Sequence, residues 1–329
     1  GQVFIFRFKG SEAQELINSF NLKSKINCLK FNDVKEELLI GTELGKFYVL
    51  QGYTQKRRSV ALIESVTKDA IIALELLSMH KSYYVTATEN RITIWQLNEE
   101  KSAKVLESVF DIKTDKVYAL ATTNNNEHGQ LLATGTSKIT EIFEVVLSRR
   151  GTPQLVPKVN VGINYNTRQY AYSSNAVTAL TFNKDGSQLA TAYVNGNIEL
   201  WQVKDFSQIE SYFGHTSLVH SLIYTGHNNR LISGGEDQTI RIWDAQNKEN
   251  ALMLKNESAV SQIQYIDSLD KILSLRNELF IRFWPTNSLQ LVEALCQKTN
   301  ANEYLPLEEV YKYAGIEFMY DSDNCVYSQ

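Results

Sequence analysis

The sequence has little proline and little cysteine for its length. Only four of its 329 residues are Pro, and three are Cys, at Cys28, Cys296 and Cys325. Because Pro cannot donate a hydrogen bond within a sheet, its scarcity favours strands, as do the 17 Tyr and 14 Phe. An odd number of Cys without C-x-x-C spacing is typical of a reducing compartment. We therefore expect a cytoplasmic protein.

Long apolar runs and large basic blocks are missing as well. No apolar run reaches the roughly 18 residues that a transmembrane helix needs, and no signal peptide is recognisable in the residues given. The net charge is −4, which argues against nucleic acid as the main partner. We expect protein or peptide partners, no nucleic acid and no membrane association.

Catalytic motifs are also lacking. The sequence contains no G-x-x-x-x-G-K-[ST], no H-E-x-x-H and no G-x-S-x-G. Residues around His220 that could line a channel are apolar or hydroxylic, which does not make a metal site. Cys28 has no basic residue beside it in the sequence that would activate a thiolate. We expect no enzyme activity, no metal and no cofactor.

The most informative stretch runs from residue 214 to residue 244. It alternates as a strand from Val219 to Tyr224 and then turns through Gly-His-Asn-Asn. Two further short strands follow, separated by the tight turn Gly-Gly-Glu-Asp and ending at Trp243.

The spacing of Gly-His, Ser, Asp and Trp in this stretch resembles the WD-repeat family, whose members fold as β-propellers. In that family hydrogen bonds among these residue types lock a blade, and the matching positions are His215, Ser233, Asp237 and Trp243. The chemistry of the residues agrees, because a buried indole N–H needs an acceptor and Asp can orient the imidazole. Three unrelated strands with a surface Asp and His are the alternative, which recurrence of the pattern disfavours.

The position of Trp243 recurs about every 45 residues, which is the period of a repeat array. Strand patterns without a helical period favour a propeller over a helical solenoid. We therefore predict an all-β, seven-bladed WD-repeat β-propeller over residues 1–295. The recurring positions are Phe6, Leu50, Trp95, Phe143, Trp201, Trp243 and Trp284.

The repeats are degenerate. Ten residues before the recurring position, only Thr191, Ser233 and Ser274 carry a hydroxyl, and Gly-His precedes an inner strand once. We therefore expect one blade with the full polar lock. The first blade starts in its third strand, so its two inner strands are expected upstream of Gly1.

The segment 296–329 differs from the repeats. Pro306, Glu308, Glu309, Lys312 and Gly315 are placed as in a short capped helix, which predicts a C-terminal helical tail, with a floppy tail as the alternative. The segment resembles the ending of bacterial multidomain proteins whose C-terminal half is a WD-repeat array. The resemblance implies an upstream STAND-type nucleotide-triphosphatase or caspase-like effector domain, with the propeller as sensor. The matching residues are Ala294, Cys296, Asn300, Leu305, Glu308, Glu309, Tyr313, Gly315 and Cys325.

An insertion at 161–174 is the predicted partner-binding loop. Tyr and Arg are enriched at binding hot spots, and a loop insertion changes the closure entropy little. The alternative is a longer connection whose tyrosines lie back on the blade. The predicted partner-binding residues are Tyr165, Arg168, Tyr170 and Tyr172 in the loop, with Glu89, Asn195 and Glu278 in turns.

Binding rather than catalysis is the expected function, because a propeller presents loops on a rigid scaffold. The main hypothesis is the C-terminal sensor domain of a larger signalling or defence protein. The alternative is a stand-alone scaffold subunit of a stable multiprotein complex. A propeller hydrolase is the alternative from another class, and it would need a catalytic cluster.

Overall fold

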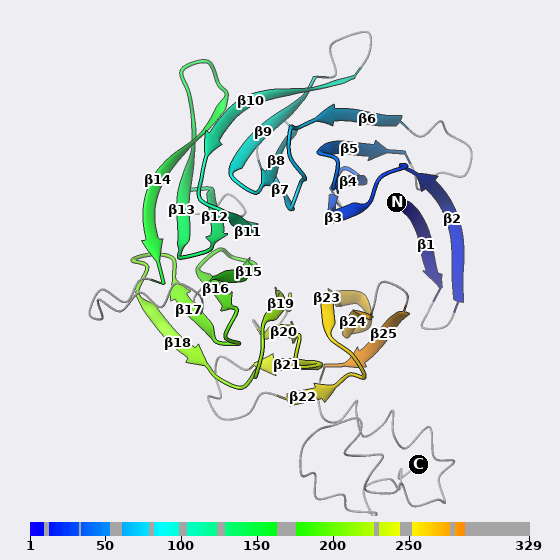
Figure 1. Cartoon of the computed structure of the whole chain (residues 1–329), viewed down its shortest axis with the longest axis vertical. Coiled ribbons are helices and arrows are strands. Elements are labelled where there is room, and N and C mark those ends of the chain that lie inside the picture. Colours follow the sequence, from blue (N-terminus) through cyan, green and yellow to red (C-terminus); the bar gives the residue numbers. More distant parts are fainter. Residues whose placement is uncertain are drawn as a thin grey trace, which may run out of the picture. The chain divides into compact units, whose positions relative to one another are not determined.

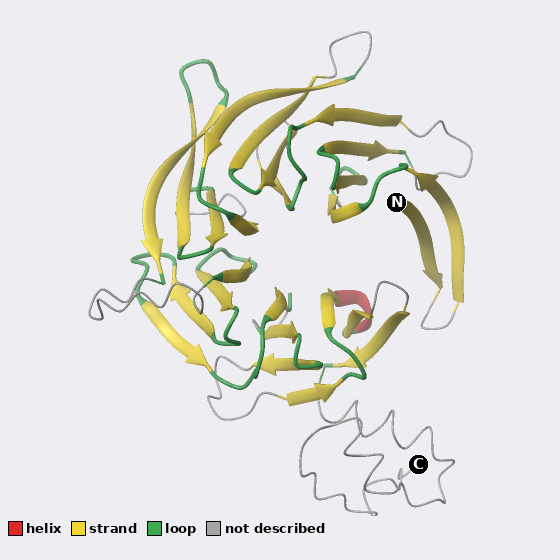
Figure 2. Ribbon diagram, viewed as in Figure 1, coloured by secondary structure: helices red, strands yellow, loops and turns green. Residues whose placement is uncertain are grey.

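The computed structural model describes residues 1–9, 13–32, 34–52, 61–78, 82–98, 104–123, 129–162, 176–226, 230–243, 252–276 and 280–286 (Figure 1). Within these ranges the chain is all-β, with 25 strands and a single 3-10 helix, η1 (Asp267–Leu269) (Figure 2). The chain divides into two compact units, Gly1–Arg168 and Gln169–Gln329.

The first unit holds a two-stranded sheet followed by three four-stranded sheets, each an antiparallel meander of consecutive strands. Figure 1 shows the first strand of each four-stranded sheet on the inner side of the unit and the last strand on the outer side. The strands are β1 (Gln2–Lys9), β2 (Ala13–Asn21), β3 (Ile26–Asn32), β4 (Glu37–Thr42), β5 (Lys46–Gln51), β6 (Ala61–Val66), β7 (Ala73–Ser78), β8 (Ser82–Thr88), β9 (Arg91–Asn98), β10 (Val105–Lys113), β11 (Val117–Thr122), β12 (Leu131–Thr136), β13 (Thr140–Leu147) and β14 (Pro153–Val161).

The second unit holds two four-stranded sheets and one three-stranded sheet with the same meander order. Its strands are β15 (Val177–Phe182), β16 (Gln188–Tyr193), β17 (Ile198–Gln202), β18 (Gln208–Tyr212), β19 (Val219–Tyr224), β20 (Leu231–Gly235), β21 (Thr239–Trp243), β22 (Leu252–Lys255), β23 (Val260–Ile266), β24 (Lys271–Arg276) and β25 (Phe280–Pro285).

The core lies between the faces of successive sheets. Apolar side chains of β4 and β5 pack against those of β7 to β9, and the rings of Phe47 and Tyr84 lie 6.0 Å apart, edge to face. The middle strands are buried on both faces, so β12 is buried at every residue from Leu131 to Thr136. Gly41 allows the close approach of two sheets, because a Cβ there would lie 2.6 Å from Cys28 Sγ and from Ile71 Cγ2.

These sheets form the blades of an all-β β-propeller fold, as the repeats predict, but the predicted number of blades is wrong. Six sheets have three or four strands, and the first has only two, because β1 pairs with β2 alone among the described residues. The predicted helical tail, at 296–329, lies outside the described residues, which end at 286. The division at residues 295 and 296 therefore stays a prediction.

Candidate functional site: the polar lock and the turns

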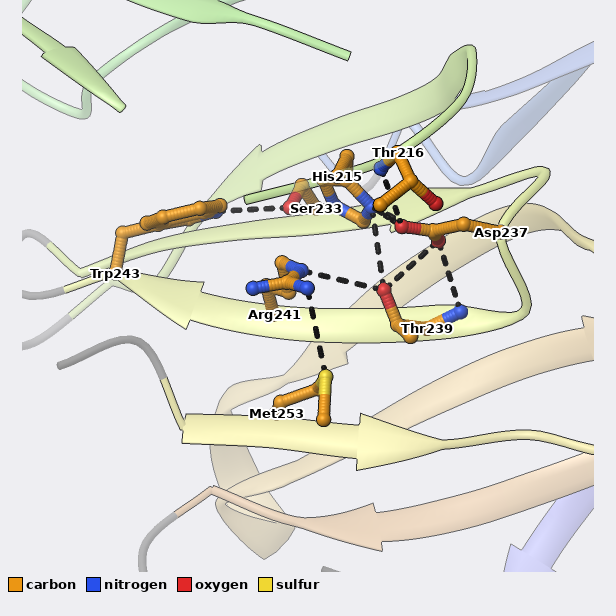
Figure 3. Close-up of polar contacts among 8 residues, drawn as sticks. All are labelled: His215, Thr216, Ser233, Asp237, Thr239, Arg241, Trp243 and Met253. Atoms are coloured by element: carbon orange, nitrogen blue, oxygen red, sulfur yellow. Dashed lines mark hydrogen bonds and ion pairs between the residues drawn. The ribbon is translucent and has the colours of Figure 1, made fainter. Parts of the chain in front are cut away.

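The residues His215, Ser233, Asp237 and Trp243 form one chain of hydrogen bonds (Figure 3). The indole Nε1 of Trp243 donates to Ser233 Oγ at 2.8 Å, and Ser233 Oγ lies 2.7 Å from His215 Nε2. The other ring nitrogen, His215 Nδ1, lies 2.9 Å from Asp237 Oδ2. Strands β20 and β21 supply Ser233 and Trp243, the turn between them supplies Asp237, and the loop before β19 supplies His215.

The same chain of Asp, His and Ser occurs in hydrolases that use a serine nucleophile, but here it cannot serve that chemistry. The side chain of Ser233 is fully buried, and its oxygen already accepts the indole N–H of Trp243. A substrate carbonyl cannot reach an oxygen that solvent does not reach. The arrangement therefore stabilises the blade, and the hydrolase alternative has no nucleophile in this sheet.

The carboxylate of Asp237 accepts three further hydrogen bonds, which favour its ionised form. Burial alone would raise its pKa, but the hydrogen bond and charge of His215 lower it, and so do the hydrogen bonds from Thr239 and Thr216. The backbone N–H groups of Thr239 and Thr216 donate at 3.0 and 3.1 Å, and Thr239 Oγ1 donates at 2.8 Å. The pKa of Asp237 accordingly lies well below its usual range.

Sequence reasoning missed the part played by Thr239, Arg241 and Gly214. Thr239 Oγ1 also accepts from Arg241 Nε at 3.3 Å, and the Arg241 guanidinium lies 5.9 Å from the centre of the Trp243 ring. Gly214 packs against this pair, since a Cβ there would lie 2.6 Å from Arg241 Nη1. Two sequence features could have indicated these roles. Thr239, Arg241 and Trp243 alternate on one face of β21, and a Gly directly precedes His215.

Three other sheets satisfy their Trp indole with a hydroxyl, without His and Asp. Trp201 donates to Thr191 at 3.1 Å and Trp284 donates to Ser274 at 2.8 Å, at the ten-residue spacing of the sequence pattern. Trp95 donates to Thr86 at 2.8 Å, although Thr86 lies nine residues before it. The shorter turn between β8 and β9 changes the spacing, which is why the sequence pattern overlooked Thr86.

In the sheet of β15 to β18, Tyr193 and Glu199 extend this hydroxyl chain. Thr191 Oγ1 lies 3.3 Å from Tyr193 OH, which donates to Glu199 Oε2 at 2.5 Å. Burial raises the pKa of Glu199, and the hydrogen bond from Tyr193 lowers it only in part. Burial and the neighbouring Glu199 charge also raise the pKa of Tyr193 well above its usual value.

The predicted partner-binding residues are placed only in part. Glu89 is exposed in the turn between β8 and β9, and Lys116 Nζ lies 2.8 Å from its Oε1. Asn195 is exposed in the turn between β16 and β17, where its Oδ1 accepts the N–H of Asn197 at 3.0 Å. Five other residues, Tyr165, Arg168, Tyr170, Tyr172 and Glu278, lie outside the described residues.

Cys28 is a partly buried thiol with a raised pKa, which disfavours the nucleophilic thiolate. Burial raises its pKa to about 12, and its Sγ lies 3.9 Å from the carbonyl oxygen of Ile71.

The imidazole of His220 contacts a carboxylate, since its Nε2 lies 2.5 Å from Glu236 Oε2. In the part of the chain that the structure describes, no three His, Cys, Asp or Glu side chains gather as a metal site, and no helix is long and apolar enough to cross a membrane.

Comparison with known families shows where the fold belongs. Residues 73–275, more than half of the chain, match the family described as Nucleolar protein 10-like, N-terminal domain. The chain belongs to this family. The match runs from β7 into β24. It includes the polar lock and four complete four-stranded sheets, which are β7 to β10, β11 to β14, β15 to β18 and β19 to β22.

Curated relatives match shorter segments. The U3 snoRNP-associated protein-like EMB2271 of Arabidopsis thaliana is 29% identical over 87 residues, 26% of this chain and 18% of that protein. The serine-threonine kinase receptor-associated protein of Gallus gallus is 26% identical over 135 residues, 40% of this chain and 38% of that protein. The eukaryotic translation initiation factor 3 subunit I of Bombyx mori is 26% identical over 113 residues, 32% of this chain and 34% of that protein.

The matched segments span less than two fifths of each of these relatives. The comparisons confirm the predicted WD-repeat propeller, but they do not support the STAND-type sensor half or the upstream effector domain. The names of the relatives fit the scaffold alternative better than the sensor hypothesis. The expectation of a cytoplasmic protein is wrong, because the family and the U3 snoRNP-associated relative point to the nucleolus.

Proposed function

We propose that the chain is a non-catalytic, protein-binding scaffold subunit of a nucleolar ribonucleoprotein assembly. The observation that carries the proposal is the match of residues 73–275 to a nucleolar family, and the U3 snoRNP-associated relative supports it. The buried Ser233 fits this proposal, because its hydrogen bonds stabilise a blade and make its own oxygen unavailable as a nucleophile.

Exposed charge pairs in the first unit fit a polar partner surface. Lys116 pairs with Glu89 at 2.8 Å and Lys138 pairs with Asp115 at 3.3 Å, and about half of each of these side chains is exposed. Exposed ion pairs contribute little to folding stability. Each of these side chains can therefore leave its present ion pair and pair with an opposite charge on a partner. Complementary charges fix the register of two proteins and speed their association.

The proposed contact residues come from the insertion at 161–174 and from single turns of the two units, each taken by itself. Tyr and Arg side chains in the insertion offer large contact area and bidentate hydrogen bonds to carboxylates. Its members are Tyr165, Arg168, Tyr170, Tyr172, Glu89, Asn195 and Glu278.

The test is the location and the size of the assembly in which the chain resides. A tagged chain should concentrate in the nucleolus, sediment with large complexes and co-purify with the U3 RNA. Asp237→Ala, which we expect to weaken the fold, serves as a folding control, and a tagged propeller of an unrelated family serves as a control for location. A chain that spreads through the cell and sediments alone would contradict the proposal.

A further inference from the structure

The turn between β13 and β14 carries two adjacent arginines on the outer side of the first unit (Figure 1). Arg149 and Arg150 are both exposed, and neither guanidinium has a partner among the residues that the structure describes. The segment 144–158 contains one carboxylate, Glu144, which already contacts Lys158 Nζ at 3.6 Å. The two arginine charges are therefore available to a partner.

Hydrogen bonds hold this turn in one shape. The N–H of Ser148 donates to the carbonyl of Thr152 at 2.8 Å, and the N–H of Gly151 donates back to the carbonyl of Ser148 at 2.9 Å. Gly151 adopts the left-handed conformation, with φ at 74°, that glycine tolerates without strain. From β8, the hydroxyl of Tyr83 donates to the carbonyl of Gly151 at 3.3 Å. A turn that is already ordered loses little conformational freedom when it binds.

An apolar side chain lies directly beside the arginines. Leu147, the last residue of β13, is 59% exposed. One register step further from the turn, Val145 lies opposite Leu155, and these two side chains are 8% and 5% exposed. The apolar face of the hairpin therefore extends from the core to the turn, where Leu147 reaches solvent. A partner that covers Leu147 removes apolar surface from water, which favours association.

We propose that residues 147–152 form a docking surface for an acidic segment of a partner protein. Carboxylates of the segment pair with Arg149 and Arg150, because the planar guanidinium matches the two oxygens of a carboxylate. An apolar side chain of the segment covers Leu147. The inference goes beyond the proposed function, since this surface is separate from the insertion at 161–174 and its chemistry does not depend on the compartment.

An RNA strand fits this surface less well than a protein segment does. The N–H groups of Arg150 and Thr152 could otherwise bind a phosphate, but both donate to Ser148 Oγ, at 3.3 and 3.2 Å. Proteins that bind single strands stack bases on aromatic side chains, and the segment 144–158 contains no aromatic residue. The exposed Leu147 also has no apolar counterpart on a sugar-phosphate backbone.

Fluorescence anisotropy with the full chain and three labelled probes tests the inference. The probes are a 12-residue peptide that repeats Asp-Glu-Leu, the same peptide with Asn-Gln-Leu, and a 12-nucleotide oligouridine. The acidic peptide should bind saturably and at least about tenfold more tightly than the other two. The net charge of the chain is −4, so general electrostatic attraction does not favour an acidic probe.

Substitutions locate the binding on the turn. Arg149→Gln together with Arg150→Gln should weaken binding of the acidic peptide by about tenfold or more, and Leu147→Ser should weaken it by about threefold or more. The matched control is Lys68→Gln together with Lys113→Gln, which removes the same charge from two exposed side chains of the first unit. The control should bind as wild type does, and all variants should keep the wild-type melting temperature.

Four outcomes overturn the inference. Tighter binding of oligouridine than of the acidic peptide would assign the arginines to RNA. Absence of saturable binding of the acidic peptide, or equal binding of the neutral peptide, would remove the acidic partner. An equal loss of affinity in the lysine control and the arginine variant would show that the turn is not the site. The location of the chain in the cell enters none of these outcomes, so failure of the proposed function is a separate result.

Discussion

The buried hydroxyl of Ser233 shows how three residue types can form either a catalytic or a structural chain. Nucleophilic catalysis needs a serine oxygen that substrate can reach, with the histidine positioned as base. In this protein the oxygen of Ser233 accepts the indole N–H of Trp243, and both side chains are buried. The function of His215 and Asp237 is consequently to satisfy a buried donor.

Replacement of Asp237 should destabilise this blade in particular. Asp237→Ala leaves the buried Nδ1 of His215 and the backbone N–H of Thr239 without their acceptor, which should cost about 1–3 kcal/mol of unfolding free energy. Urea denaturation measures the loss. Ser137→Ala, in a turn without this chain, is the control, and an equal loss in both variants would show that Asp237 has no special role.

At the scale of the element, the four sheets that contain a Trp satisfy its indole N–H with different residues. The turn between β20 and β21 supplies Asp237, whereas β17 supplies Glu199 through Tyr193. The pKa values of the two carboxyl groups are shifted in opposite directions. The pKa of Asp237 is lowered and the pKa of Glu199 is raised. The two sheets should therefore differ in how their stability depends on pH.

Glu199→Gln should stabilise the protein relative to wild type as the pH rises from about 4.5 toward 7. The pKa of Glu199 is higher in the folded than in the unfolded state, so the folded state binds more protons and loses stability with rising pH. Gln retains an acceptor for Tyr193 without this loss. Unfolding free energies across this pH range measure the effect.

The control for this prediction is Asp237→Asn, which should show the opposite trend. The pKa of Asp237 is lowered on folding, so its stabilisation is complete above the unfolded pKa of about 3.9 and fades as the pH falls below it. The advantage of wild type over Asp237→Asn should thus shrink on acidification. Differences that do not change with pH would contradict both assignments.

At the scale of the whole molecule, the blades serve as a frame for loops and turns. Strands buried on both faces, as in β12, make the frame rigid, and connecting segments can vary without altering it. Partner recognition should therefore be separable from stability by substitution in a loop.

The double variant Arg168→Ala, Tyr170→Ala should weaken partner binding by more than about tenfold and leave the melting temperature nearly unchanged. Calorimetric titration with the co-purified partner measures the affinity. Lys56→Ala, Arg57→Ala, which removes two basic side chains far from the insertion in the sequence, is the matched control and should bind as wild type does. Unchanged affinity of the first variant would place the partner site elsewhere.

The sequence by itself determined the class of fold and the members of the polar chain. Strand alternation is a local property, and the ten-residue spacing from hydroxyl to Trp follows from two strands joined by a tight turn, so both are readable without a structure. Tertiary structure alone decided that Thr86 replaces the expected hydroxyl, that Tyr193 and Glu199 extend another chain, and that Tyr83 bonds to Gly151. These features depend on turn length and on which sheet covers which face, and those are set by packing between residues distant in the sequence.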